Sequence, residues 1–181
     1  ISSDVAAGLR TPLAEAERLK RNYGCALGRM VNDDEEIEVP GVGGHGPRRA
    51  ARRLLSDIIE PRVEEIFSEA RRRIEETGLL EQVSSGCVLT GGAALMEGMV
   101  ECAEEILGMP VRLGFPVGVR GIVQLVQGPQ YATGVGLVRY GAQQLSDASR
   151  GGISPVEQAI SPSEAIAKSK SGFWGWIRAA F

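Results

Sequence analysis

Hydrophobic residues recur every three or four positions in two early stretches of the chain, residues 11–24 and 48–77. This period is typical of amphipathic helices that bury one face, so both stretches are predicted to be helical. Pro61 lies inside the second stretch and predicts either a kink or a division into two helices, because proline removes a backbone donor and clashes with the preceding turn. Between the two helices, alternating apolar and polar residues at 25–31 and 36–42 predict two short strands joined by an acidic turn.

The middle of the chain changes from strand spacing to helix spacing and back. The sequence CVLT at 87–90 has the pattern of a buried strand, and a glycine pair follows it. Helical spacing covers 96–108, and PVRLG at 110–114 predicts a second strand. A strand, a crossover helix and another strand form a parallel βαβ unit, so the fold class is predicted to be α/β. A last helical pattern, rich in small residues, covers 131–141.

The C-terminal part of the chain has two different compositions. Residues 143–171 are mostly Ser, Ala, Gly and Pro, which predicts a flexible linker because such a stretch buries little apolar surface. Residues 172–181 hold both tryptophans, and at about 100° per residue their apolar side chains cover an arc of about 160°. This arc predicts an amphipathic helix that lies in a membrane surface; the alternative is a helix that folds back onto the domain. The residues assigned to the membrane contact are Phe173, Trp174, Trp176, Ile177, Arg178 and Phe181.

The composition narrows the function classes. The chain has 181 residues, of which 43% are hydrophobic and 24% charged, so it is expected to bury the core of one domain or of two small ones. A net charge of −3 argues against a general nucleic-acid binder. Three widely spaced cysteines and one histidine fit neither a disulfide framework nor a zinc site, which favours a reducing cytoplasm. Because the chain does not begin with methionine, we expect it to be a fragment.

Several sequence blocks together resemble one protein family. They include ISSDVAAGLRTPLAEAERLKRNYGCALG, EVPGVGGHGPRR, IIEPR, CVLTGGAALMEGMVECAEEILGMPVRLGFP and QYATGVGLVRYG, in that order along the chain. These blocks resemble the C-terminal half of FtsA, the actin-like bacterial cell-division protein. The resemblance implies an actin-like (actin/Hsp-type ATPase) second lobe with two subdomains over residues 1–142, the smaller one inserted at about 24–85. The flexible linker and the amphipathic tail helix follow it.

The resemblance also implies a nucleotide site and a peptide site. FtsA-like proteins bind ATP with Mg²⁺ between two lobes, and the matching nucleoside-side positions here are Glu17, Lys20, Gly91, Gly92 and Ala93. A surface ion pair would explain the Glu17 and Lys20 spacing equally well. The C-terminal peptide of FtsZ is implied to bind at Arg48, Arg52, Glu60, Pro61 and Arg62, since arginines grip carboxylates. A solvated basic helix face is the alternative there.

The implied role is that of an adaptor rather than an enzyme. FtsA-like proteins polymerise, recruit other division proteins and tether FtsZ filaments to anionic lipids on the cytoplasmic face of the inner membrane, at the division site. The phosphate-binding and catalytic half of the family is missing from this chain, so we expect weak nucleotide binding and no hydrolysis. A pilus-assembly actin homologue and a fragment of a sugar or acetate kinase of the same superfold are the alternatives. The aromatic tail and the IIEPR block favour the division adaptor.

Overall fold

The computed structural model describes residues 1–78, 85–118 and 123–151, so the predicted membrane segment 172–181 lies outside the described residues. The chain divides into two compact units, residues 1–135 and 136–181. The helices and strands are α1 (Ser2–Leu9), α2 (Leu13–Tyr23), β1 (Glu36–Val39), β2 (Arg48–Ala51), α3 (Arg52–Glu76), β3 (Cys87–Leu89), α4 (Met99–Leu107), β4 (Val111–Leu113) and α5 (Ala132–Gly151). Short 3₁₀ helices cover Gly28–Met30 (η1), Gly92–Leu95 (η3), Val123–Val126 (η4) and Pro129–Tyr131 (η5). Within these described ranges, no helix is both long and apolar enough to cross a membrane.

Two helices open the first unit. The helix α1 was not predicted, although Val5 and Leu9 have helical spacing and both are completely buried. The helix α2 confirms the prediction for 11–24 and buries Ala16 and Leu19 against the common core. These two helices pack against each other before the chain reaches its first strand.

The strand prediction for this region is half correct. Residues Glu36–Val39 form β1, but its antiparallel partner is β2 at Arg48–Ala51, which the pattern had assigned to a helix. The predicted strand at 25–31 is wrong: Cys25 makes one isolated bridge with Glu97, and the chain then turns into η1. The partner of a strand is chosen by non-local pairing, which a local alternation of side chains cannot reveal.

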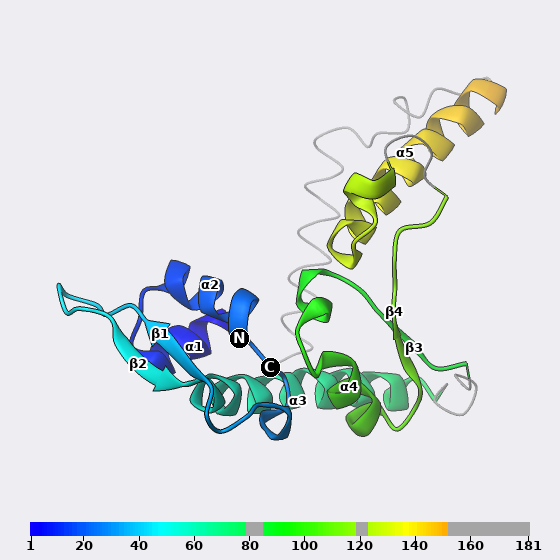
Figure 1. Cartoon of the computed structure of the whole chain (residues 1–181). Helices are drawn as coiled ribbons and strands as arrows, with labels where there is room; N and C mark the ends of the chain where they lie inside the picture. Colours follow the sequence, from blue (N-terminus) through cyan, green and yellow to red (C-terminus); the bar gives the residue numbers. More distant parts are fainter. Residues whose placement is uncertain (79–84, 119–122, 152–181) are drawn as a thin grey trace, which may run out of the picture. The chain divides into compact units, whose positions relative to one another are not determined.

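The helix α3 is the longest element of the first unit. It is a single helix of 25 residues that continues through Pro61, so the proline does not divide it. Its buried positions include Leu55, Ile59, Val63 and Phe67, which are four residues apart and so lie on one face. The helix contacts α1 and α2 as well as α4. In Figure 1, α1, α2 and the β1–β2 hairpin lie over its first half and α4 lies against the rest.

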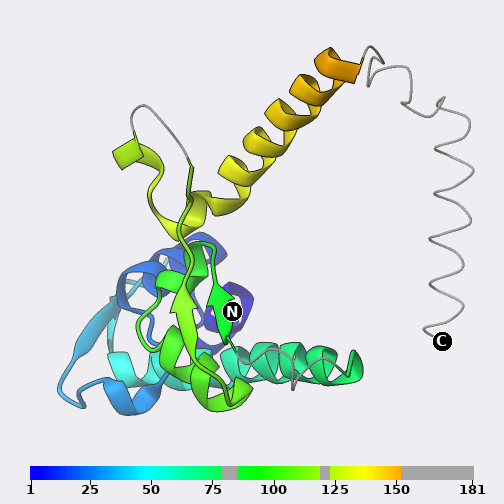
Figure 2. The same cartoon turned by 90° about the vertical axis from the view of Figure 1, so that its right-hand side faces the viewer.

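The predicted βαβ unit is present. Strands β3 and β4 pair in parallel, with Cys87 opposite Val111 and Leu89 opposite Leu113. The two strands run side by side in Figure 2, and α4 between them in sequence buries Met99, Cys102, Ala103 and Leu107. The described residues therefore form a mixed α/β fold with two small sheets.

One hydrophobic core serves the whole first unit. It joins residues of α1, α2, β1, α3, α4 and β4, and so it includes side chains from inside and outside the segment 24–85 that was expected to form a subdomain. That subdomain boundary stays a prediction. At the other end, α5 continues to Gly151, so residues 143–151 are helical where a flexible linker was predicted. The polar composition of residues 143–151 led us to expect little burial and therefore no regular structure. The helix nevertheless continues into these residues from the more apolar stretch before them.

Candidate functional site

A cavity of about 440 Å³ lies in the first unit, within the size range of small-molecule sites. It is lined by Glu17, Lys20, Arg21, Gly92, Ala93, Leu95, Met96 and Gln130. Four of the five residues predicted for the nucleoside side, Glu17, Lys20, Gly92 and Ala93, therefore lie together although the two pairs are more than seventy positions apart in the sequence. Gly91, the fifth, directly precedes the lining residues.

The wall from α2 carries a hydrogen-bonded charge pair. The ammonium of Lys20 donates to Glu17 Oε2 over 2.6 Å and to Ser2 Oγ over 3.0 Å. The Ser2 hydroxyl in turn donates to the same Glu17 oxygen. The hydrogen bond from Lys20, and then that from Ser2, hold the pKa of Glu17 below its usual range. This carboxylate is therefore ionised at neutral pH and held by two donors on one oxygen.

A second wall comes from the turn between β3 and α4. Gly91 has φ 98° and ψ 167°, a conformation that is essentially restricted to glycine. Its N–H donates to the carbonyl of Pro129 over 3.1 Å, which ties the turn to the segment that carries Gln130. The glycine pair then enters η3, where Gly92 and Ala93 present backbone and a single methyl group to the cavity.

The lining chemistry fits a nucleoside. An ionised carboxylate accepts hydrogen bonds from vicinal hydroxyls, and a floor of Gly92 and Ala93 allows a flat ring to approach the backbone closely. Leu95 and Met96 add apolar surface. Among the described residues there is no group of three or more His, Cys, Asp or Glu side chains that could hold a metal ion.

Four lining residues were missed by the sequence reasoning. Arg21, Leu95 and Met96 are neighbours of predicted residues, so extending each motif by one or three positions would have found them. Gln130 carried no signal, because it reaches the cavity only through the contact of η5 with η3.

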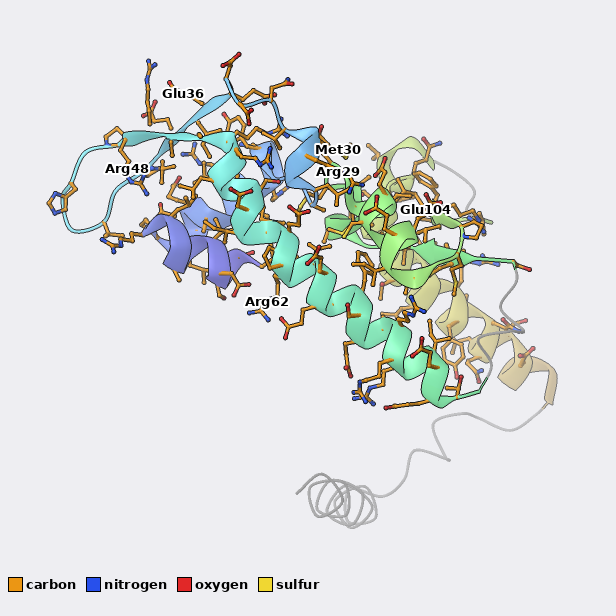
Figure 3. The ribbon with its side chains drawn as sticks, turned by 90° about the horizontal axis from the view of Figure 1, so that it is seen from below. Arg29, Met30, Glu36, Arg48, Arg62 and Glu104 are labelled. Carbon is orange, nitrogen blue, oxygen red and sulfur yellow. The ribbon has the colours of Figure 1, made fainter. Side chains whose placement is uncertain are left out.

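Two of the three arginines predicted for the peptide site, Arg48 and Arg62, contact α1. Arg48 donates to the carbonyl of Leu9 at the end of α1, and Arg62 makes two hydrogen bonds of 2.8 and 2.9 Å to Asp4 near its start. Figure 3 shows Arg48 and Arg62 beside the two ends of this helix. The Arg62 guanidinium holds the pKa of Asp4 well below its usual range, and Asp4 in turn raises the pKa of Arg62. Both arginines thus hold α1 in place.

The other predicted peptide-site residues differ in their exposure. Pro61 is exposed on α3, whereas Glu60 is half-buried and its Oε2 accepts a hydrogen bond from the N–H of Gly28. Arg52 has an exposed side-chain fraction of only 15%, and all three of its nitrogens donate to groups of the same chain. Arg52 is therefore held by internal partners in this arrangement, and its place in the peptide site stays a prediction. The predicted membrane residues lie outside the described part of the chain.

Comparisons with known proteins identify the family of the chain. The family model described as "Cell division protein FtsA" matches residues 1–136. The chain is similar to cell division protein FtsA of Pseudomonas aeruginosa, with 45% identity over 147 residues, which cover 81% of this chain and 35% of the relative. It is 35% identical to cell division protein FtsA of Escherichia coli (strain K12) over 193 residues, covering 100% of this chain and 43% of the relative. It is 40% identical to cell division protein FtsA of Neisseria meningitidis over 139 residues, which cover 76% of this chain and 34% of the relative.

The matches cover most of this chain, whereas the chain spans between 34% and 43% of the length of these curated relatives. The family match ends near the start of α5, after the whole of the cavity and all three arginines described above. The chain belongs to the FtsA family of cell division proteins.

Proposed function

We propose that this chain forms the nucleoside-binding side of an ATP site in an actin-like cell-division adaptor. The observation that carries the proposal is a cavity that is lined both by Glu17 and Lys20 of α2 and by Gly92 and Ala93 of the glycine turn. The carboxylate would receive the ribose hydroxyls, and the turn would lie against the base. ATP brings Mg²⁺ and a triphosphate, for which a partner lobe would supply the phosphate-binding groups.

A competition experiment tests this proposal. We expect ATP, ADP and adenosine to bind the chain with similar dissociation constants of about 0.1–1 mM, because the groups assigned here contact the nucleoside. Inorganic triphosphate should not compete. Binding that depends on the phosphates would contradict the assignment. So would the absence of binding by all three ligands at about 10 mM, which is tenfold the upper end of the expected range.

The adaptor role includes a dock for the C-terminal peptide of FtsZ. Arg62 uses Nε and one terminal nitrogen for Asp4, and its other terminal nitrogen donates to Glu65. The side chains of Arg62 and Glu65 are 41% and 67% exposed, so a peptide carboxylate would replace Glu65 at this solvent-facing edge of the guanidinium. We place an acidic group of the peptide on that edge, with Arg48, Glu60 and Pro61 around it. A titration with labelled FtsZ C-terminal peptide tests the dock, and charge reversal at Arg62 is the decisive variant.

The remaining parts of the proposal concern assembly and the membrane. Residues 172–181 would bind anionic lipids on the cytoplasmic face of the inner membrane at the division site, and self-association into a polymer would multiply that weak contact. Polymer formation would also gather other division proteins. The chain is not proposed to be an enzyme, and purified chain should turn over no ATP above background. A pilus-assembly homologue would lack binding to the FtsZ peptide, and a sugar or acetate kinase fragment would lack lipid binding.

A further inference from the structure

The cavity has two principal walls that come from distant segments. Glu17, Lys20 and Arg21 belong to α2, whereas Gly92, Ala93, Leu95 and Met96 belong to η3 and the residue after it. The width of the cavity therefore depends on whatever links the end of α2 to the end of η3.

Arg52, at the start of α3, makes that link. Its Nε donates to the carbonyl of Tyr23, the last residue of α2, over 2.8 Å. One terminal nitrogen donates to Glu97, which directly follows the lining residue Met96. The other donates to Glu35 over 2.6 Å, just before β1. One planar guanidinium thus holds three segments, two of which continue directly into the cavity walls.

The chemistry of this link depends on the fork shape of arginine. Each of the three nitrogens serves a different segment, and the side chain is only 15% exposed, so it cannot swing out without leaving all three acceptors. A lysine ammonium is a single point charge on a flexible stem and does not reproduce this geometry.

A backbone contact supports the same connection. The N–H of Ala26 donates to the carbonyl of Glu97 over 2.8 Å, so the main chain of Glu97 is tied to the segment that follows α2. The next residue, Gly98, has φ 73°, and a Cβ there would lie 3.1 Å from the backbone nitrogen of Leu27. The position of Glu97 is thereby fixed from both its main chain and its side chain.

We infer that Arg52 is a positioning residue, which acts through Tyr23 and Glu97 to set the spacing between the two walls of the cavity. This inference rests on the proposed nucleotide site for its functional meaning. It assigns Arg52 to the cavity and removes it from the peptide dock, while Arg62 stays at the dock. The two sites should therefore respond separately to changes at these two arginines.

A matched pair of variants tests the inference. Glu97→Ala and Glu35→Ala each remove one carboxylate from the same guanidinium, and the two side chains have similar exposure, 45% and 37%. Only Glu97 adjoins the cavity wall. We expect Glu97→Ala to weaken ATP binding about 3- to 10-fold, and Glu35→Ala to leave it within about twofold. Arg53→Ala, beside Arg52 but paired with Asp33 and Asp57, serves as a second control.

Hydrogen exchange supplies a readout that does not depend on the nucleotide. The amides of Ala94 and Met96 donate within η3, to Gly91 and Ala93. Glu97→Ala should speed their exchange about threefold or more relative to the unchanged chain, whereas Glu35→Ala should not. Equal exchange in the two variants would overturn the inference, as would equal ATP affinities. If the unchanged chain binds no ATP, the proposed function fails, and the exchange comparison still decides the role of Arg52.

Discussion

Replacing Glu17 with glutamine tests the acceptor on which the proposed nucleoside site depends. Both internal donors, Ser2 and Lys20, bind Glu17 Oε2, and among the described residues no hydrogen bond reaches Oε1. A glutamine side chain can keep its oxygen in the Oε2 position and so retain both internal bonds. Its amide group then replaces the charged acceptor that faces a ligand. The substitution therefore changes the ligand contact while preserving the local packing.

The expected loss follows from the exposure of this side chain. A hydrogen bond to a charged group contributes about 1.5–3 kcal/mol when it is well shielded. The Glu17 side chain is 44% exposed, so solvent screening reduces the value to about 1 kcal/mol, or about fivefold in affinity. The Glu17→Gln substitution should weaken adenosine binding by this factor. It should leave the affinity for a 2′,3′-dideoxy analogue unchanged, because that analogue lacks the hydroxyls that Glu17 would bind.

Calorimetric titration of both ligands into the unchanged and Glu17→Gln chains measures this difference. Glu15→Gln is the matched control, since Glu15 lies on the same helix, pairs with Arg18 and does not line the cavity. Because the folded-state pKa of Glu17 is lowered, its charge is lost only as the pH falls through that lowered value, and affinity should be constant between about pH 6 and 8. Equal affinity of the Glu17→Gln and unchanged chains for adenosine would refute the role of Glu17.

Three further predictions concern the peptide dock, the tail and the core. Arg62→Glu should weaken binding of an FtsZ C-terminal peptide at least about fivefold, whereas Arg72→Glu, on the same helix, should not; equal titrations would count against the dock. Deleting residues 172–181 should abolish sedimentation with anionic liposomes, and undiminished sedimentation would contradict the membrane assignment. Leu55→Ala should lower the free energy of unfolding by about 3 kcal/mol, because Leu55 is completely buried, while Leu54→Ala, 43% exposed, should cost less than about 1 kcal/mol in urea titrations.

Elements defined by local periodicity were predictable from the sequence. The buried residues Leu55, Ile59, Val63 and Phe67 follow helical spacing, and the βαβ unit has apolar strands on either side of an amphipathic helix. The strand at Arg48–Ala51 was not predictable, because its conformation depends on pairing with Glu36–Val39. Its own letters, RRAA, favour a helix.

The candidate site shows the same division. Glu17 and Lys20 were identifiable from helical spacing together with the family resemblance, and the glycine pair from its place between a strand and a helix. The role inferred for Arg52 could not be identified from the sequence, because its acceptors Glu35 and Glu97 lie 17 and 45 positions away. A row of arginines in a sequence does not tell which of them are consumed by internal partners.

The most direct test of the nucleoside site is a map of the amide signals that move when adenosine or ATP is added to the isotope-labelled chain. The proposed site predicts that the largest NMR shifts fall on residues 17–21 and 91–96, the two walls that meet in the cavity, and that both ligands move the same signals. Shifts confined to α5 or to the surface around Arg62, or no shifts at millimolar ligand, would contradict the assignment of the cavity to the nucleoside.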